Sequence, residues 1–143
     1  MIIHTASEGI SLAKKFENDS AAFYETLAQK YPKDAETFLA FAKENKKNII
    51  QTERVYFGVI TDAIEGSYAF NLETDDYTLE IDLKANAKYA DILKQAVKIE
   101  EKIIKYYSNA AEQSRPLMAD VPRAFELLAR KRGARLEKLK LLA

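Results

Sequence analysis

The sequence contains no cysteine and a single histidine, His4. Without cysteine the chain cannot form a disulfide, a thiolate zinc site, an iron–sulfur cluster or a cysteine nucleophile. Since His4 precedes the first predicted helix, histidine-based metal sites and catalytic triads have almost no side chain to use. These two absences exclude most of the common metal-binding and catalytic arrangements.

Neither sign of charge is in excess, and long apolar runs are also lacking. Lys and Arg number 22, and Asp and Glu number 22, so the formal net charge is zero, which argues against nucleic acid as the main partner. No run approaches the ~18 apolar residues that a membrane helix needs, and residues 1–5 lack the basic start and long apolar stretch of a secretory signal. We therefore expect a cytoplasmic protein with no nucleic-acid or membrane partner.

Turn signals divide the chain into four long segments with helical periodicity. With 48% hydrophobic and 31% charged residues, the composition is that of an ordinary globular protein, and the length of 143 residues suits one domain, residues 1–143. The predicted helices run from the capping-box pattern Thr5–Glu8 to the residue before Tyr31, from Asp34 as N-cap to about Ile64 with Gly66 as a stop, from near Asn86 to Gln113–Ser114, and from Asp120–Pro122 almost to Ala143.

The loops predict how these helices are connected. Because the first and last loops are short, the first two helices should form one antiparallel hairpin and the last two another. The connector between the hairpins, residues 66–85, is long enough for a crossover to the other end of the bundle. Within it, Thr78–Leu83 alternates polar and apolar residues, which predicts a short extended piece. The predicted fold class is all-α, a four-helix bundle with a long crossover between its second and third helices.

The connector also has more aromatic and apolar residues than a solvated loop needs. Since aromatic residues favour the cores of interfaces, we expect a homodimer. In the alternative, these side chains cap the open end of the bundle. The residues concerned are Tyr68, Phe70, Leu72 and Tyr77.

One pattern occurs in both halves of the chain and predicts a duplication. Coincidence is the alternative, because amphipathic helices always share some spacing, but here Glu and Tyr recur at the same offsets. The first copy reads Ala13-x3-Glu17-x5-Phe23-Tyr24-x3-Ala28, followed by Phe38-x2-Phe41-Ala42-x2-Asn45-x2-Asn48, and the second reads Ala96-x3-Glu100-x5-Tyr106-Tyr107-x3-Ala111, followed by Phe125-x2-Leu128-Ala129-x2-Arg132-x2-Arg135.

Helical spacing predicts which polar residues of these phrases face the interior. A helical residue shares its face with those three, four and seven positions away. By this rule Glu101 and Glu44 have mostly polar neighbours and are expected at the surface. Mainly apolar stripes surround the four predicted interior residues, Glu17, Asn45, Glu100 and Arg132.

A buried carboxylate without a partner is costly, so it either becomes protonated or finds a cation. Arg132 and Arg135 are the available cations, and a guanidinium matches the geometry of a carboxylate in bidentate pairs. We expect a buried network of two Glu and two Arg, with zero net charge, that excludes a divalent ion. In the alternative, the arginines extend along the helix to reach water. Tyr24 and Tyr107 either support this site or are core residues with satisfied hydroxyls.

The two phrases resemble the rubrerythrin branch of the ferritin-like superfamily over residues 6–142. The resemblance implies a ferritin-like bundle whose Glu and His ligands hold two irons for peroxide reduction or related redox chemistry. Di-iron bundles commonly carry one Glu on two helices and Glu-x-x-His on the other two. Here both Glu-x-x-His pairs are missing, as is the cysteine-ligated rubredoxin module. Only Glu17 and Glu100 match ligands of the iron site, and the vestigial positions of that site are Glu17, Asn45, Asn48, Glu100, Arg132 and Arg135.

Three functions are consistent with these residues. The first is a metal-free, non-enzymatic relative of rubrerythrin without a cofactor, which has a structural or interaction role with an unknown protein partner. The second is an oxidoreductase that retains a weak or rebuilt metal site from Glu17, Glu100 and neighbouring Glu residues. The third is a binding module that holds a small anion on the arginine pair.

Overall fold

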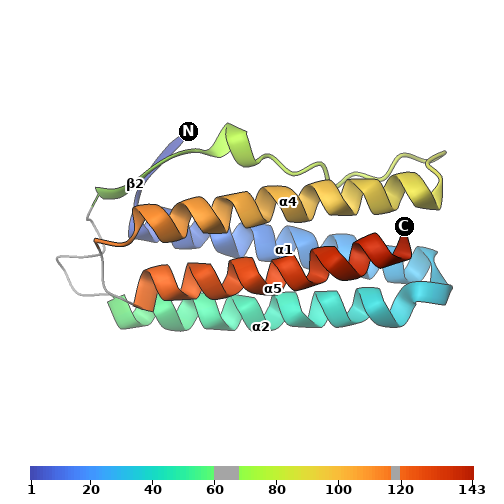
Figure 1. Ribbon diagram of the computed structural model, residues 1–143, viewed down its shortest axis with the longest axis horizontal. Helices are drawn as coiled ribbons and strands as arrows, with labels where there is room; N and C mark the ends of the chain where they lie inside the picture. The colour runs from blue at the N-terminus through green and yellow to red at the C-terminus, as the bar shows by residue number, and fades with distance from the viewer. Residues whose placement is uncertain (60–67, 117–119) are drawn as a thin grey trace.

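The computed structural model describes residues 1–59, 68–116 and 120–143. Four long helices lie side by side along the long axis of the molecule (Figure 1), which confirms the predicted all-α bundle. None of the helices in the described ranges has the length and apolarity that crossing a bilayer requires. The helices are α1 (Ala6–Lys30), α2 (Ala35–Val59), α4 (Tyr89–Gln113) and α5 (Asp120–Leu142).

Local sequence signals account for the ends of α1. The Glu8 N–H donates to the Thr5 hydroxyl at 3.1 Å, and the Thr5 N–H donates to the Glu8 carboxylate at 3.0 Å, which confirms the predicted capping box. At the other end the Tyr31 N–H donates to the Leu27 carbonyl, and a short 3-10 helix, η1 (Pro32–Asp34), turns the chain into α2. α1 packs along α2 as one hairpin, and α4 packs along α5 as the other (Figure 1).

The start of α2 agrees with the prediction and the start of α4 differs. α2 begins at Ala35, and the Asp34 carboxylate accepts a hydrogen bond from the Tyr89 hydroxyl at 2.5 Å, which links this turn to α4. α4 begins at Tyr89 instead of Asn86, because residues 84–87 form a turn closed by a backbone hydrogen bond. The predicted boundaries at Gln113 and Asp120 are confirmed, whereas the predicted end near Ile64 and stop at Gly66 lie outside the described residues.

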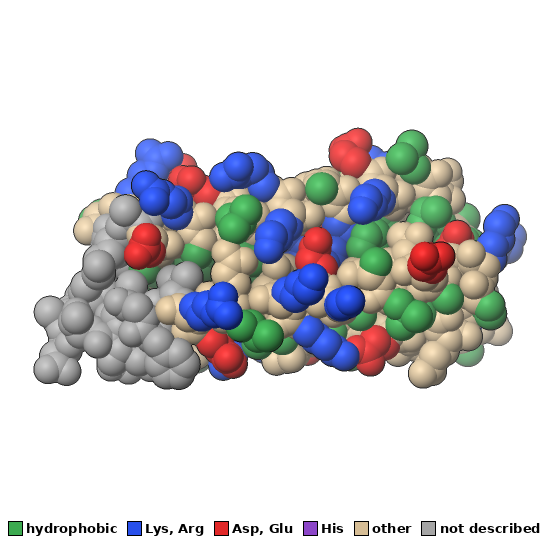
Figure 2. Space-filling view, turned by 90° about the horizontal axis from the view of Figure 1, so that it is seen from below, with side chains coloured by type: hydrophobic (Ala, Val, Ile, Leu, Met, Phe, Trp, Pro, Cys, Tyr) green, Lys and Arg blue, Asp and Glu red, His purple; other side chains and the backbone are tan. Residues whose placement is uncertain are grey.

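The apolar stripes of the four helices meet in one core, as amphipathic helices require. Side chains of both charge signs lie on the outer surface (Figure 2). The core includes fully buried residues from α1, α2, α4 and α5, such as Leu27, Phe38, Ile103 and Leu128.

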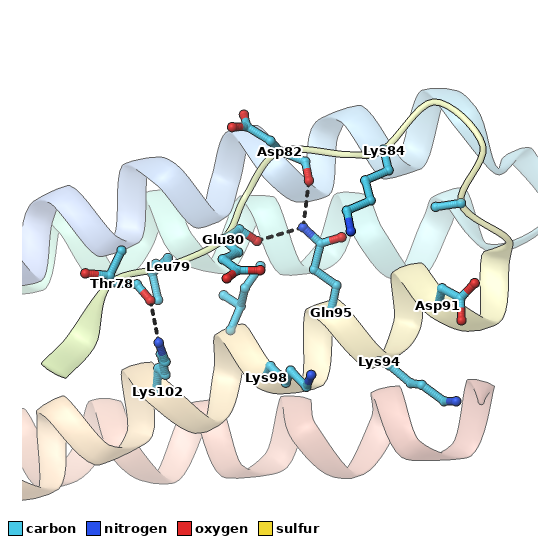
Figure 3. Close-up of a pocket in the computed structure, with 12 residues that line it drawn as sticks. Thr78, Leu79, Glu80, Asp82, Lys84, Asp91, Lys94, Gln95, Lys98 and Lys102 are labelled. Atoms are coloured by element: carbon cyan, nitrogen blue, oxygen red, sulfur yellow. Dashed lines mark hydrogen bonds between the residues drawn. The ribbon is translucent and has the colours of Figure 1, made fainter. Parts of the chain in front are cut away.

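The crossover between the hairpins contains a strand that the sequence did not predict. β2 (Tyr68–Glu73) pairs antiparallel with β1 (Ile2–Thr5), with Ile3 opposite Leu72. After a 3-10 turn, η2 (Thr74–Tyr77), the predicted segment Thr78–Leu83 forms no strand. Side chains of α4 take the place of a neighbouring strand: Lys102 donates to the Thr78 carbonyl at 2.8 Å, and Gln95 donates to the carbonyls of Glu80 at 2.7 Å and Asp82 at 3.0 Å (Figure 3).

Three of the connector residues expected at a dimer interface are buried within the chain itself. Phe70, Leu72 and Tyr77 are only 3–4% exposed. The Phe70 ring meets Phe125 edge-on, and the Tyr77 ring meets Tyr106 in the same way. The expectation that these three side chains offer a free apolar surface is therefore wrong, because the bundle needs them to cover its own core. The homodimer stays a prediction without their support, and the side chain of Tyr68 lies outside the described part.

α1 approaches the crossover closely at Gly9. A Cβ atom on Gly9 would lie 3.0 Å from the Phe70 ring, and the Gly9 carbonyl accepts a hydrogen bond from the buried Tyr106 hydroxyl at 2.6 Å. Gly133 in α5 differs, since an added Cβ would meet nothing within 4 Å. Packing therefore requires a glycine at the first position and not at the second.

We expect Gly133→Ala to stabilise the protein by about 1 kcal/mol, the difference in helix propensity between the two residues. Gly9→Ala has the same propensity gain but must displace the Phe70 ring, so it should be destabilising overall. Urea unfolding followed by circular dichroism measures both changes. Equal upward shifts of the two midpoints would contradict this account of the α1–β2 contact.

Candidate functional site

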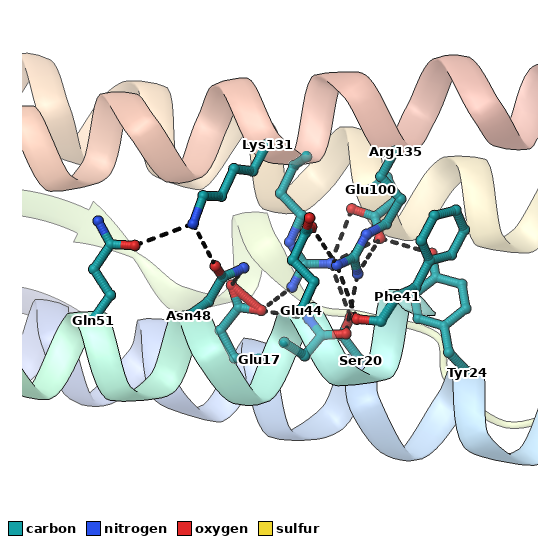
Figure 4. Close-up of polar contacts among 12 residues, drawn as sticks. Glu17, Ser20, Tyr24, Phe41, Glu44, Asn48, Gln51, Glu100, Lys131 and Arg135 are labelled. Atoms are coloured by element: carbon teal, nitrogen blue, oxygen red, sulfur yellow. Dashed lines mark hydrogen bonds and ion pairs between the residues drawn. The ribbon is translucent and has the colours of Figure 1, made fainter. Parts of the chain in front are cut away.

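Six polar residues predicted from the duplicated phrases meet in the middle of the bundle. Each of the four described helices contributes to this core network, which lies between the hairpins (Figure 4). All six side chains are buried, with exposed fractions of 0–2%. The core network consists of Glu17 from α1, Asn45 and Asn48 from α2, Glu100 from α4, and Arg132 and Arg135 from α5.

Glu17 accepts hydrogen bonds from three other helices. Asn45 Nδ2 donates to its Oε2 at 2.5 Å, and Asn48 Nδ2 donates to its Oε1 at 3.1 Å. The Tyr107 hydroxyl donates to Oε1 at 2.9 Å, and Arg132 Nη2 donates to Oε2. A carboxylate has about four acceptor positions, so Glu17 is fully satisfied as an anion.

Arg132 connects this carboxylate to the one on α4. Its Nη1 donates to both oxygens of Glu100, at 2.8 and 3.0 Å, while its Nη2 binds Glu17. The same Nη1 also donates to the Ser20 hydroxyl at 2.9 Å. One guanidinium therefore bridges two carboxylates that come from opposite hairpins. The arrangement in which the arginines reach out to water is not the one observed.

Tyr24 and Tyr107 cross-connect the two halves of the chain. The Tyr24 hydroxyl of the first hairpin donates to Glu100 of the second at 2.7 Å, and the Tyr107 hydroxyl of the second donates to Glu17 of the first. Both rings are 0% exposed. These tyrosines are therefore members of the polar network as well as of the core.

Arg135 occupies the side of the network nearer to solvent. Its Nη1 donates to Asn45 Oδ1 at 3.1 Å and lies 3.4 Å from Glu100 Oε1, while its Nη2 donates to the Phe41 carbonyl at 3.1 Å. The guanidinium carbon also lies 5.3 Å from the centre of the Tyr24 ring and 4.9 Å from that of Phe41. These ring faces stabilise the cation in addition to its hydrogen bonds.

Three residues of the site were not assigned to it from the sequence. Glu44, predicted at the surface, accepts a hydrogen bond from Arg135 Nη2 at 2.7 Å although its side chain is 38% exposed. Lys131 donates to Asn48 and Gln51, both at 3.3 Å, and Ser20 binds Arg132. Helical spacing did not predict Glu44 or Lys131 as interior residues, because both lie at the edge of the interior faces of their helices. Contacts with the neighbouring helix make them part of the site.

In this site, burial and neighbouring charges shift the pKa of Arg132 in opposite directions. Burial on its own lowers the pKa of Arg132, but the carboxylates of Glu100 and Glu17 outweigh it and raise the pKa above its ordinary value. Arg132 is therefore charged at every physiological pH. Two carboxylates and two guanidiniums make the buried part neutral, and the partly exposed pair Glu44 and Lys131 adds one charge of each sign.

The residues present do not suit a di-iron centre or a free anion. Di-iron four-helix bundles hold iron with carboxylates and imidazoles, whereas α2 and α5 of this protein contribute two amides and two guanidiniums. Within the described ranges, no cluster of three or more His, Cys, Asp or Glu side chains could hold a metal ion. The terminal nitrogens of both arginines are already bonded to protein oxygens, which argues against a small anion on the pair.

A surface pocket lies elsewhere. It has a volume of about 360 Å³ and is located between residues 78–87 and the outer side of α4, at the surface (Figure 3). None of its lining residues belongs to the core network.

No family model, curated protein or solved structure matches this chain. The geometry of the core network therefore has to be interpreted from its own residues.

We expect Arg132→Ala to destabilise the protein by about 3–5 kcal/mol, because it leaves Glu17 and Glu100 as buried carboxylates without their shared cation. Arg130→Ala, an exposed arginine of the same helix, and Glu101→Ala on α4 should each change stability by about 0.5 kcal/mol or less. Midpoints of guanidinium chloride unfolding give the comparison. Similar small shifts for all three variants would contradict the buried bridge.

A second prediction concerns alkaline pH. Burial and the neighbouring Glu100 anion raise the pKa of Tyr24 well above its usual value, and burial and Glu17 do the same for Tyr107. Above about pH 10 the unfolded chain loses these phenolic protons while the folded chain keeps them, so each tyrosine lowers the free energy of unfolding by about 1.4 kcal/mol per pH unit. Their contribution is fully present below pH ~10 and is lost as the pH rises toward the folded pKa.

The double variant Tyr24→Phe/Tyr107→Phe separates these groups from the other tyrosines. It should be less stable than the wild type at neutral pH, because two hydrogen bonds to carboxylates are lost. Above about pH 10 its stability should decrease less steeply. Urea unfolding at a series of pH values tests this, and parallel curves for the two proteins would count against it.

Proposed function

We propose that this protein is a metal-free relative of rubrerythrin with a ferritin-like bundle, in which a network of Glu and Arg replaces the di-iron centre and the role is structural or interactive, not enzymatic. The observation that carries the proposal is the bridge made by Arg132 between Glu17 and Glu100. In a di-iron protein the metal neutralises such facing carboxylates. Here a guanidinium does so.

The placement of the six residues supports this ancestry. Lone Glu residues stand on α1 and α4, and pairs three positions apart stand on α2 and α5, all directed at one point. This is the layout of carboxylate di-iron bundles, which use Glu on two helices and Glu-x-x-His on the other two. Each missing pair is replaced by residues that donate hydrogen bonds, so they bind the remaining carboxylates directly.

The state of the network supports a role outside catalysis. Glu17 and Glu100 would have to act as ligands or bases in redox chemistry, but Glu17 already accepts hydrogen bonds from three other helices and Glu100 from two. The alternative function, a di-iron-type oxidoreductase with a rebuilt site, would recruit Glu44 as a third carboxylate. In the structure Glu44 instead binds Arg135, which lies between it and Glu100.

Metal analysis tests this proposal. We expect the wild-type protein, purified after iron loading, to contain no stoichiometric iron, because two fixed positive charges occupy the space between the carboxylates. The variant Asn45→Glu/Asn48→His/Arg132→Glu/Arg135→His should melt at a lower temperature without metal, through repulsion among its carboxylates, and at a clearly higher temperature with Fe²⁺ or Co²⁺.

The wild type is the control, and its melting temperature should not respond to either ion. About two irons per wild-type chain with a di-iron absorption spectrum would overturn the metal-free proposal. A quadruple variant that folds but gains no stability from either ion would show that the four positions do not form the ancestral site.

A further inference from the structure

The surface formed by α2 and α5 carries a set of cations without partners. α2 lies at the lower side of the molecule in Figure 1, and the view from that side shows Lys and Arg side chains gathered over the middle of the surface (Figure 2). These exposed side chains make no ion pair with any described residue, unlike Lys14 and Lys15 on α1 and Lys46 on α2, which pairs with Glu25 of α1. We call them the basic face, which consists of Lys43 and Lys47 on α2 and of Lys138 on α5, which lies seven positions after Lys131 and so shares its helix face.

Because the chain has no net charge, the cations of the basic face gather there through their positions and not through an excess of basic residues. Like charges gathered on one surface repel each other, and an opposite charge brought to that surface relieves the repulsion. Lys131 lies beside the basic face, half-buried, and is held at 3.3 Å by the side-chain oxygens of Asn48 and Gln51. Both of these acceptors are neutral, so Lys131 is a positioned ammonium group that has no carboxylate among the described residues.

Apolar side chains flank the same cations on α2. Leu39 is 52% exposed and Ile50 is 51% exposed, and they stand on either side of Lys43 and Lys47 along the helix. The large apolar side chains exposed in the described part include no Phe or Tyr. Among the described side chains, the basic face therefore has no exposed aromatic ring of the kind on which single-stranded nucleic acids stack and which favours membrane interfaces.

A second copy of the chain also fits this face poorly. In a two-fold dimer through the basic face, the same patch of each copy meets the other, which sets lysine against lysine. A partner of the opposite charge that has its own apolar residues would both neutralise the cations and cover the exposed apolar side chains.

We propose that the basic face docks an acidic, amphipathic helix of another protein, with Glu or Asp side chains on Lys43, Lys47 and Lys131 and with apolar side chains on Leu39 and Ile50. This names the partner class for the interaction role proposed above and rests on it. The spacing of Lys43 and Lys47, four residues apart, matches Glu residues at the same spacing on a partner helix. The metal-free state of the core network is tested separately by metal analysis, so failure here leaves that result unaffected.

The experiment uses a fluorescent synthetic helix with Glu at every fourth position and Leu between them, titrated with the full-length protein. We expect saturable binding that weakens as salt is raised. Lys43→Glu/Lys47→Glu should weaken it roughly tenfold or more. The matched control Lys94→Glu/Lys98→Glu reverses two exposed, unpaired lysines of the same spacing on α4 and should leave the affinity unchanged.

A third variant, Leu39→Ser/Ile50→Ser, tests whether binding is more than a charge effect. It should also weaken peptide binding, because the apolar contacts are lost while the charge is retained. Equal losses for the α2 and α4 charge variants would overturn the proposal, as would an unchanged affinity for the serine variant. Tighter binding of duplex DNA or of phosphatidylserine vesicles through the same lysines would overturn it in favour of those partners.

Discussion

The bridge that Arg132 makes between Glu17 and Glu100 is the contact on which the interior of this bundle depends. Both carboxylates are fully buried, and a buried carboxylate without a counter-charge is too costly to remain ionised. The guanidinium has planar donors on two sides, so one side chain can satisfy both anions at once. Because the two glutamates belong to opposite hairpins, the bridge also fixes how the hairpins face each other.

The remaining members of the network contribute more to the specificity of this arrangement than to its stability. Replacing a buried ion pair by apolar residues is often neutral or stabilising, and here both arginine Nε–H groups lack an acceptor among the described residues. The network instead fixes the register of one hairpin along the other. Tyr24 and Tyr107 bind the carboxylate of the opposite half, so a slip of one hairpin along the other would break both hydrogen bonds together. The proposed ancestry gives one reason for this design, since a metal site imposes the same register on its ligands.

Much of the fold could be predicted because its signals are local. The capping box at Thr5 and Glu8 and the helix end at Gln113 depend on residues that are neighbours in sequence. Local residues gave no such signal for the strand β1, because its partner β2 comes after the second helix in the sequence. Only the folded bundle brings the two strands together. The alternation in Thr78–Leu83 did predict which side chains pack on the core, but side chains of α4 and not a neighbouring strand bind its backbone.

The sequence by itself determined that Glu17, Asn45, Glu100 and Arg132 face the interior, because a helix of fixed period places them on apolar stripes. It also determined that the buried charges could balance, since two acids and two arginines were available. Only the tertiary structure decided which atoms pair. Arg132 bridges both acids, Arg135 reaches the half-exposed Glu44, and Lys131 has only neutral acceptors. These pairings depend on the distances between helices, which are set by the packing of the whole core and are not encoded in the period of any one helix.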